Sequence, residues 1–114
     1  MRNPNTRIDY MYRDSGNNKY RGEFIVTGRL KLSDILPYLY REFSGFGDIH
    51  LFVPRAIGLP HLLTDSWDPS LDHEIHEIEE ISFVADRRTS CSSKELLTLF
   101  TSAHRKGWFW NLQR

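Results

Sequence analysis

The sequence predicts an α+β fold: a single two-layer domain in which an antiparallel sheet of about four strands carries two helices on one face. Four segments alternate apolar and polar residues as half-buried strands do, and two segments space apolar residues as helices do, with capping residues nearby. Their order is ββαββα. The 114 residues leave room for one domain, which we place at residues 8–114, after a flexible polar N-terminus at residues 1–7.

The first two strands are expected to form a hairpin. Tyrosines alternate with other residues through the segment 8–13, and a second alternating segment covers about residues 20–30. Residues 14–18 between them combine Gly and Asn, which tolerate positive φ, with Asp and Ser, which bond nearby backbone groups. Gly22 inside the second strand predicts a bulge.

A helix and a third strand follow. Ser33 is a suitable N-cap, and apolar residues then recur at helical spacing as far as Phe43. Pro37 is early enough to be tolerated in the first turn, and Gly45 favours an end to the helix. Residues 48–53 alternate again and predict the third strand.

A long irregular connection precedes the fourth strand. Residues 54–69 contain three prolines together with apolar residues that include Trp67, and such a loop usually packs over the fold or lines a site. Isoleucines recur every three residues from Ile75, which is compatible with a helix. The continuation at residues 80–84 looks extended and has no helix cap, so we predict a strand at about 75–85.

The last element is a helix. Ser92 and Glu95 form a capping-box pattern, the leucine-rich segment after them supplies an apolar face, and Gly107 ends it. Cys91, just before this helix, is expected to be an inert small residue, although a helix N-terminus can lower the pKa of a thiol.

Composition narrows the classes of function. Fifteen basic and fifteen acidic residues give zero formal charge, so long-range attraction to nucleic acid or to an anionic membrane is not expected. One cysteine excludes an internal disulfide and a Cys-rich zinc site, which fits a reducing cytoplasmic compartment. No apolar run approaches the ~20 residues needed to span a bilayer, and no signal-peptide pattern is seen, so a membrane function is not expected. The sequence also lacks a Gly-rich phosphate loop and a Gly-x-Ser-x-Gly motif, so nucleotide binding and the common acyl-transfer reactions are not expected.

The segment from Asp72 to Glu80 concentrates the polar chemistry: it holds two of the five histidines and five of the fifteen acidic residues. Imidazole nitrogens and carboxylate oxygens are suitable ligands for zinc, manganese or iron. Asp72, His73, His76 and Glu77 are therefore candidates to hold a divalent metal and activate water, as in a small metal-dependent hydrolase or nuclease.

The predicted strand argues against this metal site. Residues three apart on a strand point to opposite faces, so His73 and His76 could not both reach one ion without a bulge. Their spacing also differs from that of helical zinc proteases, in which two histidines lie four residues apart. The simpler interpretation is a solvated acidic edge strand, whose charges discourage pairing with other strands.

Charged and amide side chains surround the predicted hairpin turn, namely Arg13, Asp14, Asn17 and Lys19. An Arg fork, a Lys charge and the turn amides could together clamp an anion, such as the phosphate of a nuclease substrate. The alternative is a turn closed by Asp14 and Asn17, with Arg13 and Lys19 solvated.

Three motifs together resemble a group of small uncharacterised bacterial and phage proteins. They are Tyr-Arg-Asp-x-x-Asn-x-Lys at residues 12–19, Gly-Leu-Pro at 58–60 and Asp-His-x-x-His-Glu at 72–77. The resemblance covers roughly residues 10–85 and departs at Ile75, where an aromatic residue is expected. It carries no established activity. It implies that the hairpin turn, the loop and the acidic strand belong to one shared surface.

We therefore expect a non-enzymatic protein-interaction module without a cofactor, and a divalent metal only under the metal alternative. The expected partner is a host protein, bound by a monomer or a homodimer. Among such modules, a counter-defence inhibitor from a phage or mobile element is the kind that is consistent with the resemblance. Trp67 would be a buried anchor, and charges would set the encounter rate. The expected partner-binding residues are Arg13, Asp14, Asn17, Lys19, Trp67, His73, His76, Glu77, Glu79 and Glu80.

A third hypothesis rests on the aromatic C-terminus. Trp108, Phe109 and Trp110 follow the basic residues Arg105 and Lys106, and such a group could stack on single-stranded nucleic acid or on a partner protein. The alternative, which we favour, is that two of the three rings close the core between sheet and helix.

Overall fold

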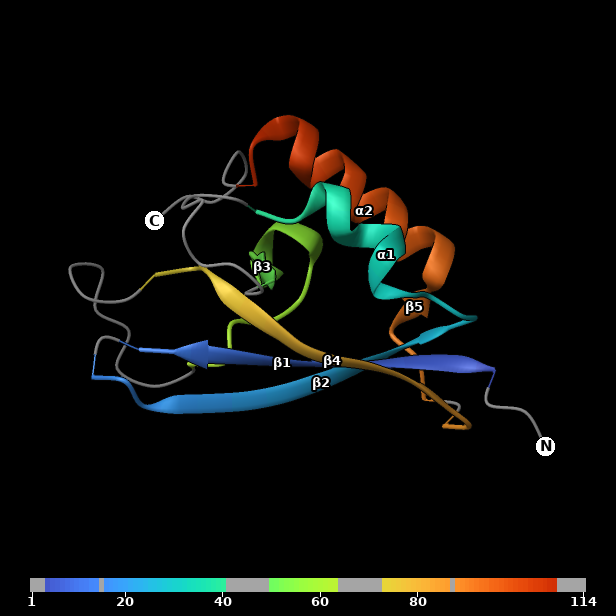
Figure 1. Ribbon diagram of the computed structural model, residues 1–114, viewed down its shortest axis with the longest axis horizontal. Helices are drawn as coiled ribbons and strands as arrows, with labels where there is room; N and C mark the ends of the chain where they lie inside the picture. Colours follow the sequence, from blue (N-terminus) through green and yellow to red (C-terminus); the bar gives the residue numbers. More distant parts are fainter. Residues whose placement is uncertain (1–3, 15, 41–49, 64–72, 87, 109–114) are drawn as a thin grey trace.

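The computed structural model of the chain describes residues 4–14, 16–40, 50–63, 73–86 and 88–108. Within these ranges the fold is α+β, and a curled sheet of five strands lies beneath two helices (Figure 1). The strands are β1 (Asn5–Arg13), β2 (Lys19–Thr27), β3 (His50–Phe52), β4 (His76–Val84) and β5 (Cys91–Ser92), in the spatial order β3-β4-β1-β2-β5. The helices are α1 (Leu32–Ile35) and α2 (Ser93–Lys106), with 3₁₀ turns η1 (Leu36–Tyr38) and η2 (Pro54–Ile57).

The sheet is mixed, which corrects the prediction of about four antiparallel strands. β1 pairs antiparallel with β2 and β4, and β3 pairs antiparallel with β4. The additional strand, β5, pairs parallel with the end of β2 at Val26↔Cys91 and Thr27↔Ser92. Two residues are too few to produce an alternation pattern, so nothing in the sequence marks this strand.

The expected hairpin is present, and β1 and β2 keep one register along their whole length. The bulge predicted at Gly22 is therefore wrong. A Cβ added to Gly22 would lie 2.6 Å from Cδ2 of Leu62, so a glycine fits here because the loop that contains Leu62 approaches the strand closely.

β1 begins at Asn5, within the segment 1–7 that we predicted to be flexible. Among the described residues, the prediction is therefore wrong for residues 5–7, which belong to a strand. The buried hydroxyl of Thr6 donates to the carbonyl of Gly28 (2.8 Å) and accepts from the N–H of Leu30 (2.9 Å). The N–H of Gly28 also donates to Oδ1 of Asn5 (3.1 Å). These bonds fasten the start of β1 to the segment after β2, which leaves the sheet at Gly28 with φ +92°.

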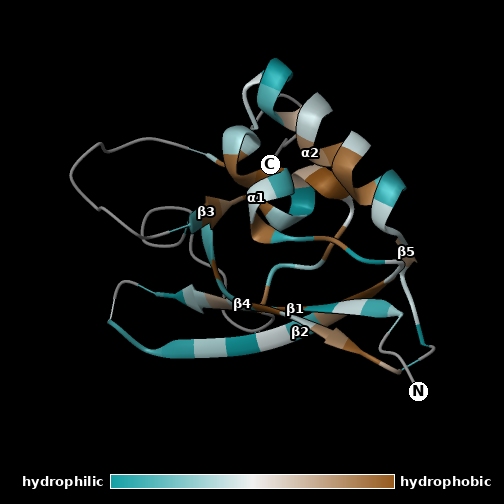
Figure 2. Ribbon diagram, turned by 45° about the vertical axis from the view of Figure 1, so that its right-hand side comes forward, coloured by the Kyte–Doolittle hydropathy of each residue, from teal (hydrophilic) through white to brown (hydrophobic). Residues whose placement is uncertain are grey.

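The core lies between the sheet and the helices. Ile8 and Tyr10 of β1 pack with residues of β2, β3 and α2, and Figure 2 shows the hydrophobic residues of α2 on the side toward the sheet. Phe100 of α2 stacks on Phe52 of β3 with ring centroids 5.9 Å apart. Trp108 is 2% exposed, and its indole N–H donates to the carbonyl of Tyr38 (3.0 Å), so this ring closes the core as we expected. Phe109 and Trp110 lie outside the described residues.

The first helix is much shorter than predicted. α1 begins after Lys31, whose N–H donates to Oδ2 of Asp34 (2.9 Å), so Ser33 is not the N-cap. Leu36 keeps the αR conformation before Pro37, but Pro37 offers no N–H to extend the α-helical hydrogen bonds, and the chain continues as η1. The predicted extension of this helix beyond residue 40 falls outside the described residues.

The predictions for the later elements are closer. β3 covers the middle of the predicted segment 48–53, and β4 is a strand over 76–84, as predicted for about 75–85. α2 has the expected capping box at Ser92, and its helix ends at Gly107, which has φ +85°. None of the helices in the described ranges has the length and apolar character needed to cross a bilayer.

The capping box at α2 generates a stability prediction. The hydroxyl of Ser92 accepts from the N–H of Glu95 (3.0 Å), and the carboxylate of Glu95 accepts from the N–H of Ser92 (3.1 Å). Ser92→Ala should lower the free energy of unfolding by about 1 kcal/mol in a urea titration, because an orphan N–H at the helix start loses its acceptor. Thr98→Ala, at an exposed position of the same helix, is the control and should change it by less than about 0.5 kcal/mol. Equal effects of the two changes would contradict a role for the cap.

Candidate functional site

The face of the sheet that α1 and α2 leave uncovered is strongly charged (Figure 1). Alternate residues of β1 and β2 point to this side, and their neighbours in β4 join them. We call this surface the open face and define it by Arg7, Asp9, Arg13, Lys19, Arg21, Glu23, Glu77, Glu79 and Glu80.

A bulge in β4 shapes the open face. The pairing between β1 and β4 shifts between Asp9 and Tyr10, because Asp9 pairs with Glu80 and Tyr10 pairs with Ile78. Glu79 is thus the additional residue, and it lies on the same side as Glu80. A regular strand would have placed these two carboxylates on opposite faces.

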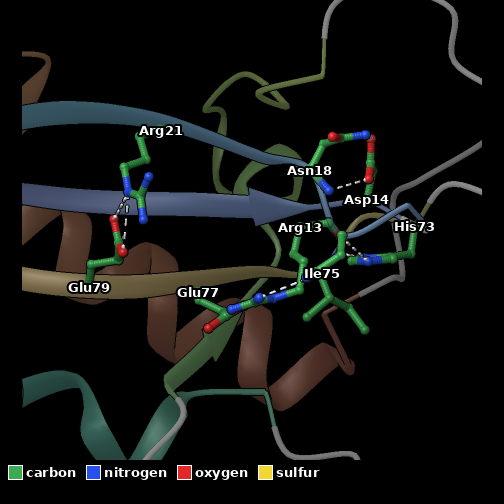
Figure 3. A network of polar contacts seen from close by, with 9 residues as sticks. Arg13, Asp14, Asn18, Arg21, His73, Ile75, Glu77 and Glu79 are labelled. Carbon is green, nitrogen blue, oxygen red and sulfur yellow. Dashed lines mark hydrogen bonds and ion pairs between the residues drawn. The ribbon is translucent and has the colours of Figure 1, made fainter.

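Ion pairs connect the strands across this face (Figure 3). Arg13 Nε lies 3.4 Å from Oε2 of Glu77, and Arg21 Nε lies 3.1 Å from Oε1 of Glu79. The second pair spans from β2 to β4 across the central strand β1. Because their side chains are 22–60% exposed, such pairs contribute on the order of 0–1 kcal/mol each, and their main effect is to orient the charged groups.

A shallow depression of about 660 Å³ lies within the open face. Glu23 and Glu80 at its rim are exposed, whereas Arg21 and Glu79 pair with each other. The depression therefore combines several carboxylates with a single guanidinium among its lining residues, and its local charge is negative although the chain is neutral. Its lining residues are Asp9, Arg21, Gly22, Glu23, Glu79 and Glu80.

The hairpin turn confirms the structural interpretation of Asp14. Oδ1 of Asp14 accepts from the N–H groups of Gly16 (2.9 Å) and Asn18 (2.8 Å), and Oδ2 accepts from the side-chain amide of Asn18 (3.2 Å). These hydrogen bonds, led by the backbone bond from Asn18, lower the pKa of the Asp14 carboxyl group. Asn17 has φ +64° and accepts from Nη1 of Arg13 (2.9 Å). The carboxylate of Asp14 is thus directed at its own turn.

The predicted loop, hairpin and acidic strand meet in the interior, around Tyr12. The ring centroid of Tyr12 lies 4.3 Å from that of His61 and 4.9 Å from those of His73 and His76. The backbone N–H of His73 also donates to the hydroxyl of Tyr12 (3.2 Å). We call the group of Tyr12, His61, His73 and His76 the histidine cluster. It attaches the connection before β4 to the hairpin.

Each imidazole of the histidine cluster is held by backbone groups at both ring nitrogens. In His76, Nδ1 donates to the carbonyl of Glu74 (3.0 Å) and Nε2 accepts from the N–H of Leu62 (3.1 Å). In His73, Nε2 donates to the carbonyl of Arg13 (3.0 Å) and Nδ1 accepts from the N–H of Ile75 (3.1 Å). Since a carbonyl can only accept, these bonds fix one neutral tautomer for each ring.

His61 follows the same scheme. Its Nε2 donates to the carbonyl of His73 (2.6 Å), and its Nδ1 accepts from the N–H of Leu63 (3.0 Å). The three rings of the histidine cluster consequently replace regular backbone pairing in an irregular segment. His61 was not among the predicted residues, because a single histidine in a loop carries no pattern.

His76 is fully buried, so its prediction as a partner-binding residue is wrong. Burial, followed by the proximity of His61 and His73, lowers its pKa from 6.5 to about 2. The expectation that His73 and His76 point to opposite faces is also wrong, because β4 begins only at His76 and both rings contact Tyr12. His73 belongs to the histidine cluster as well.

The metal alternative remains a prediction. Within the described ranges, no group of three or more His, Cys, Asp or Glu side chains is placed to hold a metal ion, and Asp72 lies outside these ranges. The lone pairs of His73 and His76 accept backbone N–H groups, and Glu77 pairs with Arg13. A metal on His73, His76 and Glu77 would have to replace these bonds.

The other residues that we predicted to bind a partner lie either on the open face or outside the described residues. Glu77, Glu79 and Glu80 lie on the open face with Arg13 and Lys19. Trp67 lies outside the described residues. The open face also includes acidic residues that we did not predict, Asp9 and Glu23, although their position in phase with Arg13 and Lys19 along the hairpin is visible in the sequence.

The thiol of Cys91 does not have the environment of a nucleophile. Burial, and then the nearby Glu95, raise its pKa, whereas reactive thiols need a lowered one. This agrees with the interpretation of Cys91 as an inert residue.

A buried carboxylate that we did not predict lies just before β4. The side chain of Glu74 is 4% exposed, and its Oε2 lies 2.6 Å from Nη1 of Arg55 in η2. This pair ties η2 to the start of β4, next to the histidine cluster.

No family model, curated protein or solved structure matches this chain in the comparisons with known proteins.

The histidine cluster generates a pH prediction. Because the pKa of His76 falls from 6.5 to about 2 on folding, the unfolded chain binds a proton below pH 6.5 that the folded chain does not bind. This contribution to stability is complete above about pH 7 and is lost as pH falls, at a rate of up to roughly 1.4 kcal/mol per pH unit. Urea titrations between about pH 4 and 7.5 should show the slope, and His76→Gln should reduce it. His104→Gln, on the exposed surface of α2, is the control. An unchanged slope in His76→Gln would contradict the assignment.

The buried pair generates a second prediction. Arg55→Ala leaves the carboxylate of Glu74 buried without this cation, and breaking a fully buried pair costs about 3–5 kcal/mol. Arg55 is 41% exposed, so we expect a smaller loss of unfolding free energy, about 1–3 kcal/mol. Adding Glu74→Gln to Arg55→Ala should recover part of it, because the uncompensated charge is removed. Strictly additive losses in this double-mutant cycle would show that the two side chains do not interact.

Proposed function

We propose that this protein is a non-enzymatic protein-interaction module that binds a partner protein through the open face. The observation that carries the proposal is the depression of about 660 Å³, in which Asp9, Glu23, Glu79 and Glu80 surround Arg21 on a sheet face that α1 and α2 do not cover. A chain of zero formal charge that gathers carboxylates at one place has the local field that complementary partners recognise.

The charges of the open face indicate how the partner is oriented. The depression is acidic, whereas Arg13 and Lys19 lie toward the hairpin tip, and Asn17 fixes the direction of Arg13. A partner that places basic groups over the depression and an acidic group near the tip would satisfy both regions. Such complementarity acts mainly on the association rate and on the choice of partner, and salt screens it.

The geometry supports binding better than it supports catalysis. The imidazoles of the histidine cluster are held by backbone groups at both nitrogens, so His73 and His76 are not presented as proton donors or acceptors in this arrangement. The carboxylates of the open face lie on a shallow surface and not in a closed pocket. If the partner is a host protein, as the resemblance to phage proteins implies, binding would make this protein an inhibitor.

Charge reversal on the open face tests the proposal. Glu23 and Glu80 are exposed, and within the described residues neither takes part in a salt bridge closer than 4 Å, so Glu23→Lys with Glu80→Lys changes the face without opening the Arg13–Glu77 or Arg21–Glu79 pairs. Immobilised protein should capture a partner from cell extract at low salt. The double variant should bind at least roughly tenfold less of it, since rim charges govern encounter and register.

The control for this experiment lies on the opposite layer. Thr98→Lys with Leu99→Lys adds positive charge to the exposed side of α2 and should leave the captured protein unchanged. Circular dichroism verifies that each variant is folded. The proposal is wrong if the open-face variant captures the same proteins in the same amounts as the parent chain.

A further inference from the structure

Over most of its length, one edge of β4 has no strand partner among the described residues. The strand runs from His76 to Val84, and on the side away from β1 it pairs with β3 only at residues 76–78. Among the described strands, none pairs with this edge at residues 79–84. Residues 80–84 keep an uninterrupted register with β1, so this stretch is a regular strand of about 17 Å. Its outward backbone N–H and C=O groups form a template for another strand.

A groove of about 330 Å³ lies beside this edge. Ile78, which is buried, and Ile81, which is half-buried, line it from β4, and Leu32 lines it from the start of α1. The groove thus extends from the core side of β4 to its edge, where Glu79 and Glu80 also line it. The complete lining is Leu30, Lys31, Leu32, His50, Ile78, Glu79, Glu80, Ile81 and Phe83.

We propose that an extended segment of a partner protein adds to this edge of β4 as a further strand, and that its side chains alternate between apolar and basic. This inference rests on the proposed function and specifies its binding mode. Successive residues of the added strand point to opposite sides of the sheet. One set enters the groove beside Ile78 and Ile81, and the other set lies beside Glu79 and Glu80 on the open face.

Charge selects the occupant. β4 contains three glutamates and no lysine or arginine, so a second copy of β4 would offer no cation to Glu79 or Glu80. The same charges that discourage pairing with a copy favour a basic strand. Lys31 lines the groove, and the guanidinium of Arg29 lies 4.8 Å from the ring centroid of Phe83. Because these two side chains already supply positive charge there, the added strand needs basic residues only at the end of the edge near Glu79 and Glu80.

The other edge of the sheet is less suitable. β5 pairs with β2 only at Val26 and Thr27, and the N–H of Ser90 donates to the carbonyl of Ile25 (2.8 Å), so residues 19–24 also lack a strand partner among the described residues. Leu62 packs against Gly22 on the core side of this strand. Lys19, Arg21 and Glu23 alternate there with both signs of charge, and such an edge resists pairing.

The test uses a fluorescein-labelled eight-residue peptide of alternating valine and lysine with the full chain. Fluorescence anisotropy should show binding, and the alternating valine–glutamate peptide should not bind. N-methylation of one set of alternate residues in the peptide should abolish binding, while N-methylation of the other set should have little effect, because only one set donates to β4. Hydrogen exchange should show new protection at amides of residues 79–84.

Matched variants locate the site. Glu80→Lys should weaken the peptide roughly five- to tenfold, since an opposite-charge cross-strand pair becomes a like-charge pair. Thr98→Lys, on the exposed side of α2 and away from the edge of β4, should change the affinity less than about twofold. The inference is overturned if the alternating valine–lysine peptide does not bind, if neither N-methylated set loses affinity, or if residues 79–84 gain no protection.

The two proposals fail in different ways. If the peptide binds but Glu23→Lys weakens it as much as Glu80→Lys, without protection of residues 79–84, the open face attracts basic chains and strand addition is wrong. If the double open-face variant leaves partner capture unchanged, the proposed function is wrong irrespective of the peptide result.

Discussion

The central strand β1 is the constraint on which the rest of the structure depends. It pairs with β2 along its whole length and with β4 from Asn5 to Met11, so both neighbours take their register from it. Its alternation sends Ile8 and Tyr10 into the core and Tyr12 to the histidine cluster, while Arg7, Asp9 and Arg13 lie on the open face. Because a strand has two faces, the packing of the core and the arrangement of surface charge are decided by the same nine residues.

Tyr12 connects this strand to the chemistry that the sequence displays most prominently. Histidines and acids before a strand resemble a catalytic or metal site, yet the rings of His61, His73 and His76 pack on Tyr12 and bond backbone groups. Burial keeps the ring of His76 neutral, and the hydrogen bonds of all three rings replace those of peptide groups. The carboxylates are different: the bulge and the strand alternation direct Glu77, Glu79 and Glu80 outward, so the proposed binding surface and the buried packing use separate parts of one short segment.

The sequence predicts the long elements well. The tyrosine alternation of β1, the capping box at Ser92 and the positive-φ glycine after α2 are local signals, and each corresponds to the structure. β5 has only two residues and depends on tertiary contacts, so no local pattern marks it. The early end of α1 was missed because we expected Pro37 to be tolerated in the first turn of a longer helix. The three-residue spacing of Ile78 and Ile81 looked helical because a bulge separates them, so both face the core side of one strand.

The candidate site is predictable only in part, for the same reason. Strand phase places Glu77 and the hairpin charges together, and the predicted phase of β1 and β2, followed along both strands, would have added Asp9 and Glu23. The burial of His76 and its contact with the distant His61 require the path of the chain between them. Pairing between Arg55 and Glu74 is likewise a contact over 19 residues that no periodicity announces.

The bulge at Glu79 has a consequence for how this chain tolerates change. Because Glu79 is the extra residue, deletion of one of the adjacent glutamates would convert the bulge into regular pairing, with a glutamate opposite Asp9 and Ile78 still opposite Tyr10. His76 and Glu77 would then keep their sides of the sheet. Loss of one glutamate here would therefore be less harmful than loss of a residue from the regular part of β4, which reverses the two faces of the strand on one side of the change.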